Sequence, residues 1–112
     1  MSESDERRRH PRIRLDGRMG GRATVLADFR VVALSDAGAS LEMSLPLVLG
    51  SACDLTLNLS HMAVDIRARV AAVHPPTVPE GPYVIDVDFL SVDALDLGLL
   101  QSFIERERRR ES

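Results

Sequence analysis

Residues 55–70 read LTLNLSHMAVDIRARV and carry the clearest pattern in the chain. An apolar residue alternates with a polar one from Leu55 to Leu59, and the alternation resumes from Val64 to Val70. Successive side chains of a β-strand point to opposite faces of the sheet, so a period of two is typical of a strand with one buried face and one solvated face. The stretch therefore predicts two β-strands.

The same alternation occurs in residues 39–44 and 83–89, and less regularly in residues 18–26 and 29–34. The segments between these strands are rich in glycine, proline, serine and aspartate, which are typical of turns. These turn segments are residues 35–38, 46–50 and 75–82, and Gly20-Gly21 forms a further break within residues 18–26. Short strands at this spacing favour a small antiparallel barrel or sandwich over a fold that alternates strands and helices.

The period changes after Leu90, where the sequence predicts a helix over about residues 91–109. Ser91 or Asp93 can cap its N-terminus. One face of this helix would carry Val92, Leu95, Leu99 and Phe103, with Leu100 and Ile104 beside them. Asp96 interrupts that apolar face, although an acidic residue in the first turn suits the helix dipole. The predicted fold class is all-β, a small six-stranded antiparallel β-barrel followed by a C-terminal α-helix.

The chain has 112 residues, which is enough for one domain, and 45% of them are hydrophobic, which suffices for a core. All 14 basic residues are arginine, and seven of them lie in residues 1–22 beside four acidic residues. Residues 29–104 contain three arginines and nine acidic residues, so a basic N-terminal segment precedes an acidic body. Because residues 1–14 show no hydrophobic period, we expect them to form a flexible arginine-rich arm ahead of a folded domain over residues 15–112.

Several classes of protein are excluded by what the sequence lacks. The charged N-terminus is not followed by the apolar stretch of a secretory signal, and no apolar run approaches the roughly 18 residues that cross a bilayer. We therefore expect a cytoplasmic protein without membrane insertion. The lone cysteine, Cys53, excludes an internal disulfide and a multi-cysteine zinc site. The histidines His10, His61 and His74 lack the spacing of a metal site, so we expect no metal site. The sequence motifs of catalytic nucleophiles and of phosphate-binding loops are missing, so we expect no enzyme activity and no catalytic residue.

Two short motifs are candidates for ligand binding. The segment RRRHPR contains the spacing R-x-x-x-R as Arg8 and Arg12. The segment LSDAGA, at a strand end, contains S-x-x-G as Ser35 and Gly38. Each motif alone has a simpler explanation, because R-x-x-x-R recurs elsewhere in the chain and S-x-x-G fits a tight turn in which Gly38 supplies a positive φ. Their order along the chain is more informative than either motif.

This order resembles the PilZ domain, a small bacterial β-barrel whose motifs are R-x-x-x-R before the barrel and (D/N)-x-S-x-x-G on it. The resemblance extends over residues 7–108 and includes the strand Val84–Leu90 and the closing helix. PilZ domains are receptors for the bacterial second messenger cyclic di-GMP. By position, the ligand residues would be Arg7, Arg8, Arg12, Ser35 and Gly38. The resemblance implies a single-domain receptor that binds the nucleotide between the arm and the barrel surface and signals to a protein partner in the control of motility or biofilm formation.

Arginine suits this ligand, because a guanidinium can bind a phosphate or the O6/N7 edge of guanine with two N–H groups and can stack on the base. Ser35 would supply a hydroxyl group, and Gly38 would let the ligand approach the backbone closely. The arm would fold over the ligand, whose contacts offset the entropy lost on ordering. An arginine directly before R-x-x-x-R, here Arg7, resembles family members that take up the nucleotide as an intercalated dimer.

The sequence departs from the family pattern at two positions. The Asp/Asn of the second motif falls on Ala33, which has no side-chain atom to accept a hydrogen bond from guanine, and Asp36 would replace it only in part. A lost hydrogen bond of about 1–3 kcal/mol would lower the affinity roughly 5- to 150-fold. Asp86 stands where the family often has glycine, and its carboxylate would repel a phosphate. The alternative function is therefore a PilZ-like interaction adaptor that does not bind the nucleotide.

The arginine arm also brings nucleic-acid-binding proteins into consideration. However, the body of the chain is acidic and the chain has four aromatic residues, three of which fit the core pattern. Few aromatic rings are therefore left on which bases could stack. We expect no specific binding of nucleic acid.

Overall fold

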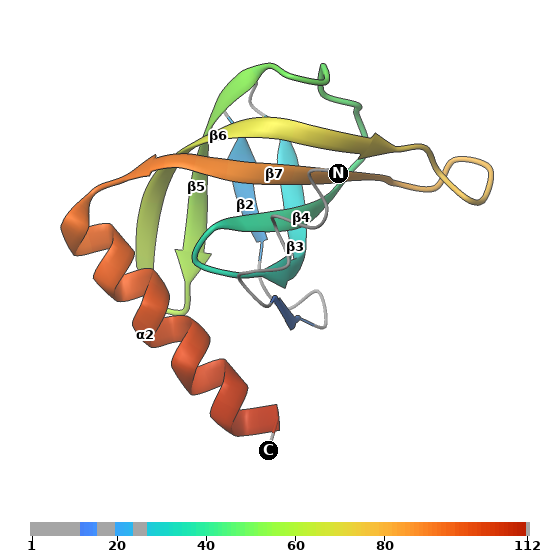
Figure 1. Ribbon diagram of the computed structural model, residues 1–112. Coiled ribbons are helices and arrows are strands. Elements are labelled where there is room, and N and C mark those ends of the chain that lie inside the picture. The colour runs from blue at the N-terminus through green and yellow to red at the C-terminus, as the bar shows by residue number, and fades with distance from the viewer. Residues whose placement is uncertain (1–11, 16–19, 24–26, 112) are drawn as a thin grey trace, which may run out of the picture.

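Seven β-strands and one α-helix form the described part of the chain, which comprises residues 12–15, 20–23 and 27–111 of this computed structural model. The strands are β1 (Ile13–Arg14), β2 (Gly20–Ala23), β3 (Asp28–Leu34), β4 (Gly38–Met43), β5 (Ala52–Leu59), β6 (Met62–His74) and β7 (Tyr83–Val92). The helix is α2 (Ala94–Glu111), which follows β7 and packs against β6 and β1 (Figure 1).

The six longer strands form one antiparallel sheet that closes on itself. Their hydrogen-bonded order is β3–β2–β5–β6–β7–β4, and β4 pairs back to β3. The short strand β1 adds to β3, with Ile13 opposite Leu34 and Arg14 opposite Ala33. The prediction of an all-β fold, a six-stranded antiparallel barrel with a C-terminal helix, is confirmed (Figure 1).

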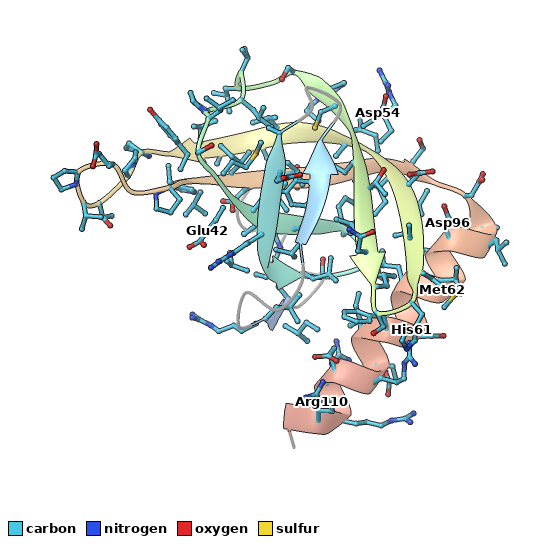
Figure 2. All side chains as sticks on the ribbon, turned by 180° about the vertical axis from the view of Figure 1, so that it is seen from behind. Glu42, Asp54, His61, Met62, Asp96 and Arg110 are labelled. Atoms are coloured by element: carbon cyan, nitrogen blue, oxygen red, sulfur yellow. The ribbon has the colours of Figure 1, made fainter. Side chains whose placement is uncertain are left out.

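The interior of the barrel is filled by the apolar side of each alternating strand. In β5 and β6, seven such side chains are at most 2% exposed. They are Leu55, Leu57, Leu59, Val64, Ile66, Ala68 and Val70. The polar residues that alternate with these side chains face outward, as does Asp54 directly before Leu55 (Figure 2). Because burial of one large aliphatic side chain contributes roughly 1.5–3 kcal/mol, the alternation supplies most of the driving force that closes this sheet.

The folded part of the chain includes residues before residue 15. Ile13 and Leu15 are buried in the core, and the N–H of Leu15 donates a hydrogen bond to the carbonyl oxygen of Val32 at 3.2 Å. Ile13 and Arg14 fall within the range of the predicted arm, yet they form β1. Residues 1–11 of that arm lie outside the described residues. The consequence for the site is that β1 fixes the position from which Arg12 extends.

The helix begins at Ala94 rather than near residue 91, because β7 continues to Val92. The carbonyl oxygen of Asp93 accepts a hydrogen bond from the N–H of Leu97 at 2.7 Å, so Asp93 rather than Ser91 stands at the N-terminal cap. Arginines occupy the last turn, where positive charge suits the helix dipole. No helix in the described part of the chain combines the length and the apolar composition needed to span a bilayer.

The buried face of α2 consists of Leu100, Phe103 and Ile104. Leu95 was predicted to share this face but is 77% exposed, so that detail of the prediction is wrong. Asp96 lies toward the barrel instead, and its Oδ2 accepts a hydrogen bond from the backbone N–H of Asp65 at 3.2 Å (Figure 2). The carboxylate that interrupts the apolar pattern therefore joins the start of the helix to β6.

Candidate functional site

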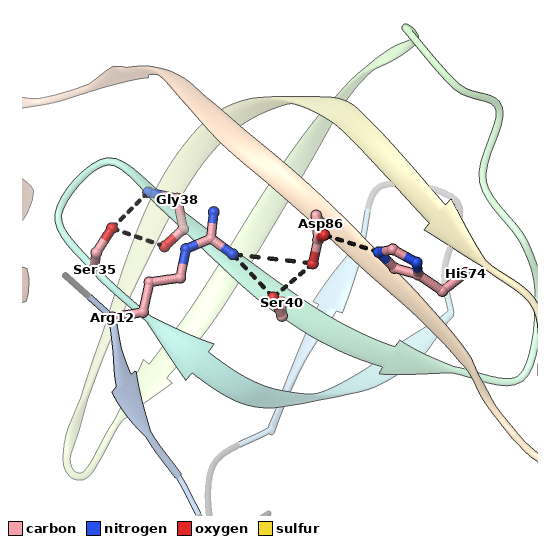
Figure 3. A network of polar contacts seen from close by, with 6 residues as sticks. All are labelled: Arg12, Ser35, Gly38, Ser40, His74 and Asp86. Atoms are coloured by element: carbon pink, nitrogen blue, oxygen red, sulfur yellow. Dashed lines mark hydrogen bonds and ion pairs between the residues drawn. The ribbon is translucent and has the colours of Figure 1, made fainter. Parts of the chain in front are cut away.

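Arg12 lies immediately before β1 and extends across the outer surface of the barrel (Figure 3). Its Nη1 donates a hydrogen bond to Oγ of Ser40 at 2.9 Å and lies 3.9 Å from Oδ1 of Asp86. The side chains of Arg12 and Asp86 are 19% and 14% exposed, so solvent screens this ion pair less than a pair on the open surface. The structure thus holds the second arginine of R-x-x-x-R over β4 and β7.

Gly38, the first residue of β4, makes room for this arginine. A Cβ atom at Gly38 would overlap the carbonyl oxygen of Val87 in the neighbouring strand and would lie 2.9 Å from Nη2 of Arg12. The explanation of Gly38 by a positive φ is wrong, because the described residues with positive φ are Gly50, Ser60 and Glu80. Glycine is needed at position 38 for close approach, and the arginine of the first motif packs on the glycine of the second.

Ser35 stabilises the turn that leads into β4. Its Oγ accepts hydrogen bonds from the N–H groups of Ala37 at 3.1 Å and Gly38 at 3.2 Å, and it donates one to the carbonyl oxygen of Gly38 at 3.4 Å. The N–H of Ser35 donates to the same carbonyl oxygen at 2.9 Å. Ser35 is 2% exposed, so these backbone groups find their partners inside the turn. The hydroxyl that was predicted to bind the ligand is engaged with the backbone here (Figure 3).

A row of outward-facing residues crosses the sheet beside Arg12. Ala33 in β3 is opposite Ser40 in β4, Ser40 is opposite Asp86 in β7, and Asp86 is opposite Ala72 in β6. Residues that are directly opposite in an antiparallel sheet project from the same face. The methyl group at the Asp/Asn position of the family pattern therefore shares a face with the carboxylate of Asp86, which lies two strands, or roughly 10 Å, away.

Asp86 connects the polar contacts in this row. Its Oδ1 accepts a hydrogen bond from Oγ of Ser40 at 2.6 Å, and its Oδ2 lies 3.0 Å from Nε2 of His74 at the end of β6 (Figure 3). Arg12, Ser40, Asp86 and His74 thus form one continuous network. The sequence did not identify Ser40 or His74, and it marked Asp86 only as a carboxylate that repels phosphate. Alternation places Ser40 and Asp86 on outward faces, but their contact joins residues 46 positions apart, which spacing does not reveal.

Three of the five predicted ligand residues come together at one end of β4. Arg12 packs on Gly38, and Gly38 is hydrogen-bonded to Ser35. Arg7 and Arg8 lie outside the described residues, so their part in the site stays a prediction. A guanidinium held over a strand by one hydroxyl and one carboxylate suits the binding of an anion or of a polar base edge.

A cavity of about 680 Å³ lies apart from this site. It is lined by residues of β3 and β4 and of segment 76–83, including Phe29, Glu42 and Tyr83. Neither Arg12 nor Gly38 lines it. The motif residues and the polar network converge at Arg12 instead, and for that reason we place the candidate site there.

Cys53, near the start of β5, lies outside the site. Burial raises the pKa of its thiol, the carboxylate of Asp54 adds to the increase, and Arg67 opposes it. A thiol with a raised pKa is a poor nucleophile, because the thiolate is the reactive form. These properties suit a small packing residue.

Comparisons with known proteins agree with this geometry. The model of the PilZ domain family matches residues 6–106. Among solved structures, the inhibitor of motility of Bacillus subtilis (MotI/DgrA) is similar in fold, with a TM-score of 0.78 at 15% identity. That similarity covers 95% of this chain and 53% of the other, so this chain spans about half the length of its structural neighbour. A search of curated proteins finds no match. Because the family model matches most of the sequence, we conclude that the chain belongs to the PilZ domain family.

Proposed function

We propose that this protein is a cytoplasmic receptor for cyclic di-GMP. It binds the nucleotide between the arginine segment 7–12 and the outer face of the barrel, and binding changes the surface offered to a protein partner. The observation that carries the proposal is the packing of Arg12 on Gly38, because one residue from each family motif meets at one place. PilZ domains act as regulatory receptors or adaptors rather than enzymes, and a site built from hydrogen-bonding groups agrees with that role.

The chemistry of cyclic di-GMP fits the side chains in this proposal. The ligand carries two phosphate charges and two guanine bases, and Arg12 can bind either group through parallel N–H donors. Arg7 and Arg8 bind the remaining groups, and their adjacency favours uptake of the nucleotide as an intercalated dimer. Ser35 holds the turn, and the absence of a side chain at Gly38 leaves room for Arg12 against the backbone.

The output of the receptor is a change in the outer face over β4 and β7. The arginine segment 7–12 directly precedes β1, so a ligand that draws Arg7 and Arg8 onto the barrel covers this face with ordered chain. A partner that recognises the covered face then responds to the nucleotide. The fold neighbour is an inhibitor of motility, and this supports motility as the process served. Control of biofilm formation is the alternative that the family resemblance implies.

Isothermal titration calorimetry of the full chain with cyclic di-GMP tests the proposal. We expect saturable binding that Arg8→Ala and Arg12→Ala each abolish, with two nucleotides per chain if the dimer is taken up. Arg67→Ala is the matched control, because Arg67 is an exposed arginine that pairs with Asp54 at 3.0 Å on β5 and β6. Heat that does not saturate, or saturable binding that survives both substitutions, would contradict the proposal.

An adaptor that docks a partner without the nucleotide is the second candidate. The observation that favours it is the row across β3, β4 and β7, in which Ala33 offers a methyl group and Asp86 holds the arginine. If the adaptor is correct, the wild-type protein does not bind cyclic di-GMP, and Ala33→Asp creates binding that the wild type lacks. The same titration therefore separates the two functions.

A further inference from the structure

We infer that Asp86 is an internal counter-ion that competes with the ligand for Arg12 and thereby sets the affinity of the site. The inference rests on the proposed function, because it concerns the regulation of the same site. It assigns a definite role to one of the two residues at which this chain departs from the family pattern.

Asp86 acts on Arg12 by two routes. Its Oδ1 lies 3.9 Å from Nη1 of the arginine, which is an ion pair. The same oxygen accepts the hydroxyl hydrogen of Ser40 at 2.6 Å, and this turns a lone pair of Oγ toward Nη1 at 2.9 Å. The carboxylate therefore attracts the arginine directly and also orients the hydroxyl that holds it (Figure 3).

An anionic ligand meets this carboxylate whenever it binds the arginine. A phosphate oxygen in hydrogen-bond contact with Arg12 lies within about one Debye length of Asp86 at physiological salt. Since both side chains of the pair are mostly shielded from solvent, the repulsion between phosphate and carboxylate is screened less than on an open surface. The ligand must therefore replace the attraction between Asp86 and Arg12, and its phosphate is also repelled by the carboxylate of Asp86.

The network allows the arginine to change partners. If Arg12 turns to a phosphate, Asp86 keeps the hydroxyl of Ser40 at 2.6 Å and Nε2 of His74 at 3.0 Å. A carboxylate left without a partner in a shielded place would be costly, and these two contacts prevent that. The exchange therefore changes the affinity of the site without disrupting β7.

The test is the substitution Asp86→Asn, which removes the charge and retains an oxygen that can accept from Ser40. We expect the Kd for cyclic di-GMP, measured by calorimetry, to fall about tenfold, which corresponds to about 1.4 kcal/mol. Asp54→Asn is the matched control, because Asp54 also pairs with an arginine but lies on β5, outside the network. It should leave the Kd unchanged. Far-UV circular dichroism confirms that both variants are folded.

The outcomes separate this inference from the proposed function. Binding by Asp86→Asn that is tighter than that of the wild type, or detectable where the wild type shows none, supports the inference. Binding by the wild type with an equal or weaker Asp86→Asn overturns the inference and leaves the receptor standing. If neither protein binds, the proposed function fails, and the inference about its ligand fails with it.

A second measurement needs no nucleotide. Urea unfolding of the wild type, Arg12→Ala, Asp86→Asn and the double variant forms a double-mutant cycle. We expect the shifts in the urea midpoint to be non-additive, because either single substitution already removes the ion pair. Additive shifts would show that Asp86 does not hold Arg12, and they would overturn the inference whatever the titrations give.

Discussion

The close packing at Gly38 makes Gly38→Ala the most direct test of the site geometry. The added Cβ atom would overlap the carbonyl oxygen of Val87 and would lie 2.9 Å from Nη2 of Arg12. Arg12 ends in a flexible side chain and can move aside. The carbonyl of Val87 belongs to the backbone of β7, which is paired with β4 on one side and β6 on the other. This carbonyl therefore cannot move aside. The substitution must therefore separate β4 from β7 or distort both strands.

The size of the effect follows from two opposing contributions. Overpacking of this kind costs about 1–3 kcal/mol. The loss of conformational freedom in the unfolded chain returns about 0.4–1 kcal/mol at most. We expect Gly38→Ala to lower the free energy of unfolding by about 1–2 kcal/mol, which for a domain of this size lowers Tm by roughly 5–10 °C. Displacement of Arg12 should also weaken the binding of cyclic di-GMP.

Thermal unfolding monitored by circular dichroism measures the first effect, and calorimetric titration measures the second. Gly98→Ala is the matched control, because a Cβ atom at Gly98 meets nothing within 4 Å. Gly98 lies inside α2, where alanine is favoured over glycine by about 0.8–1 kcal/mol, so this variant should melt at a higher temperature than the wild type. A Gly38→Ala protein that melts at or above the wild-type temperature would refute the packing argument.

Two further predictions concern single side chains. Ser35→Ala removes the acceptor of two N–H groups in its turn, and it should lower the free energy of unfolding in urea by about 1–3 kcal/mol. The control is Ser51→Ala at an exposed turn, which should change the free energy of unfolding by less than about 0.5 kcal/mol. Burial raises the pKa of the Cys53 thiol, so iodoacetamide should react more slowly with the native protein than with the urea-unfolded chain at the same pH. Equal reaction rates would contradict the raised pKa.

The strands were predictable where burial alternates strictly. The stretch that begins at Leu55 gives β5 and β6 because a barrel interior accepts every second side chain and excludes the others. β1 was not predictable, because a strand of two residues is too short to show a period. Ile13 and Arg14 are held in the sheet by pairing with Leu34 and Ala33. Strand length and helix faces depend on such tertiary contacts, and periodicity alone does not contain them.

The error at Leu95 has the same origin. The prediction put Leu95 and Asp96 on one side of the helix together with Phe103. In the structure Leu95 is exposed, and the side that faces the barrel carries Asp96, Leu100, Phe103 and Ile104. Asp96 lies toward β6 because its carboxylate accepts a hydrogen bond from the N–H of Asp65, and helical periodicity does not contain this tertiary contact.

Part of the candidate site was predictable from local motifs, and part of it depends on tertiary contacts. The family motifs assigned Arg12 and Gly38 to one site, because each motif is a short local pattern, and in the structure Arg12 packs on Gly38. Ser40, Asp86 and His74 come from three strands, and only the sheet register brings them to the arginine. The affinity that we propose Asp86 sets is therefore a property of the register. Under this proposal, a substitution at position 86 would change the concentration of ligand to which the protein responds while both family motifs remain intact, and the motifs alone would not reveal the change.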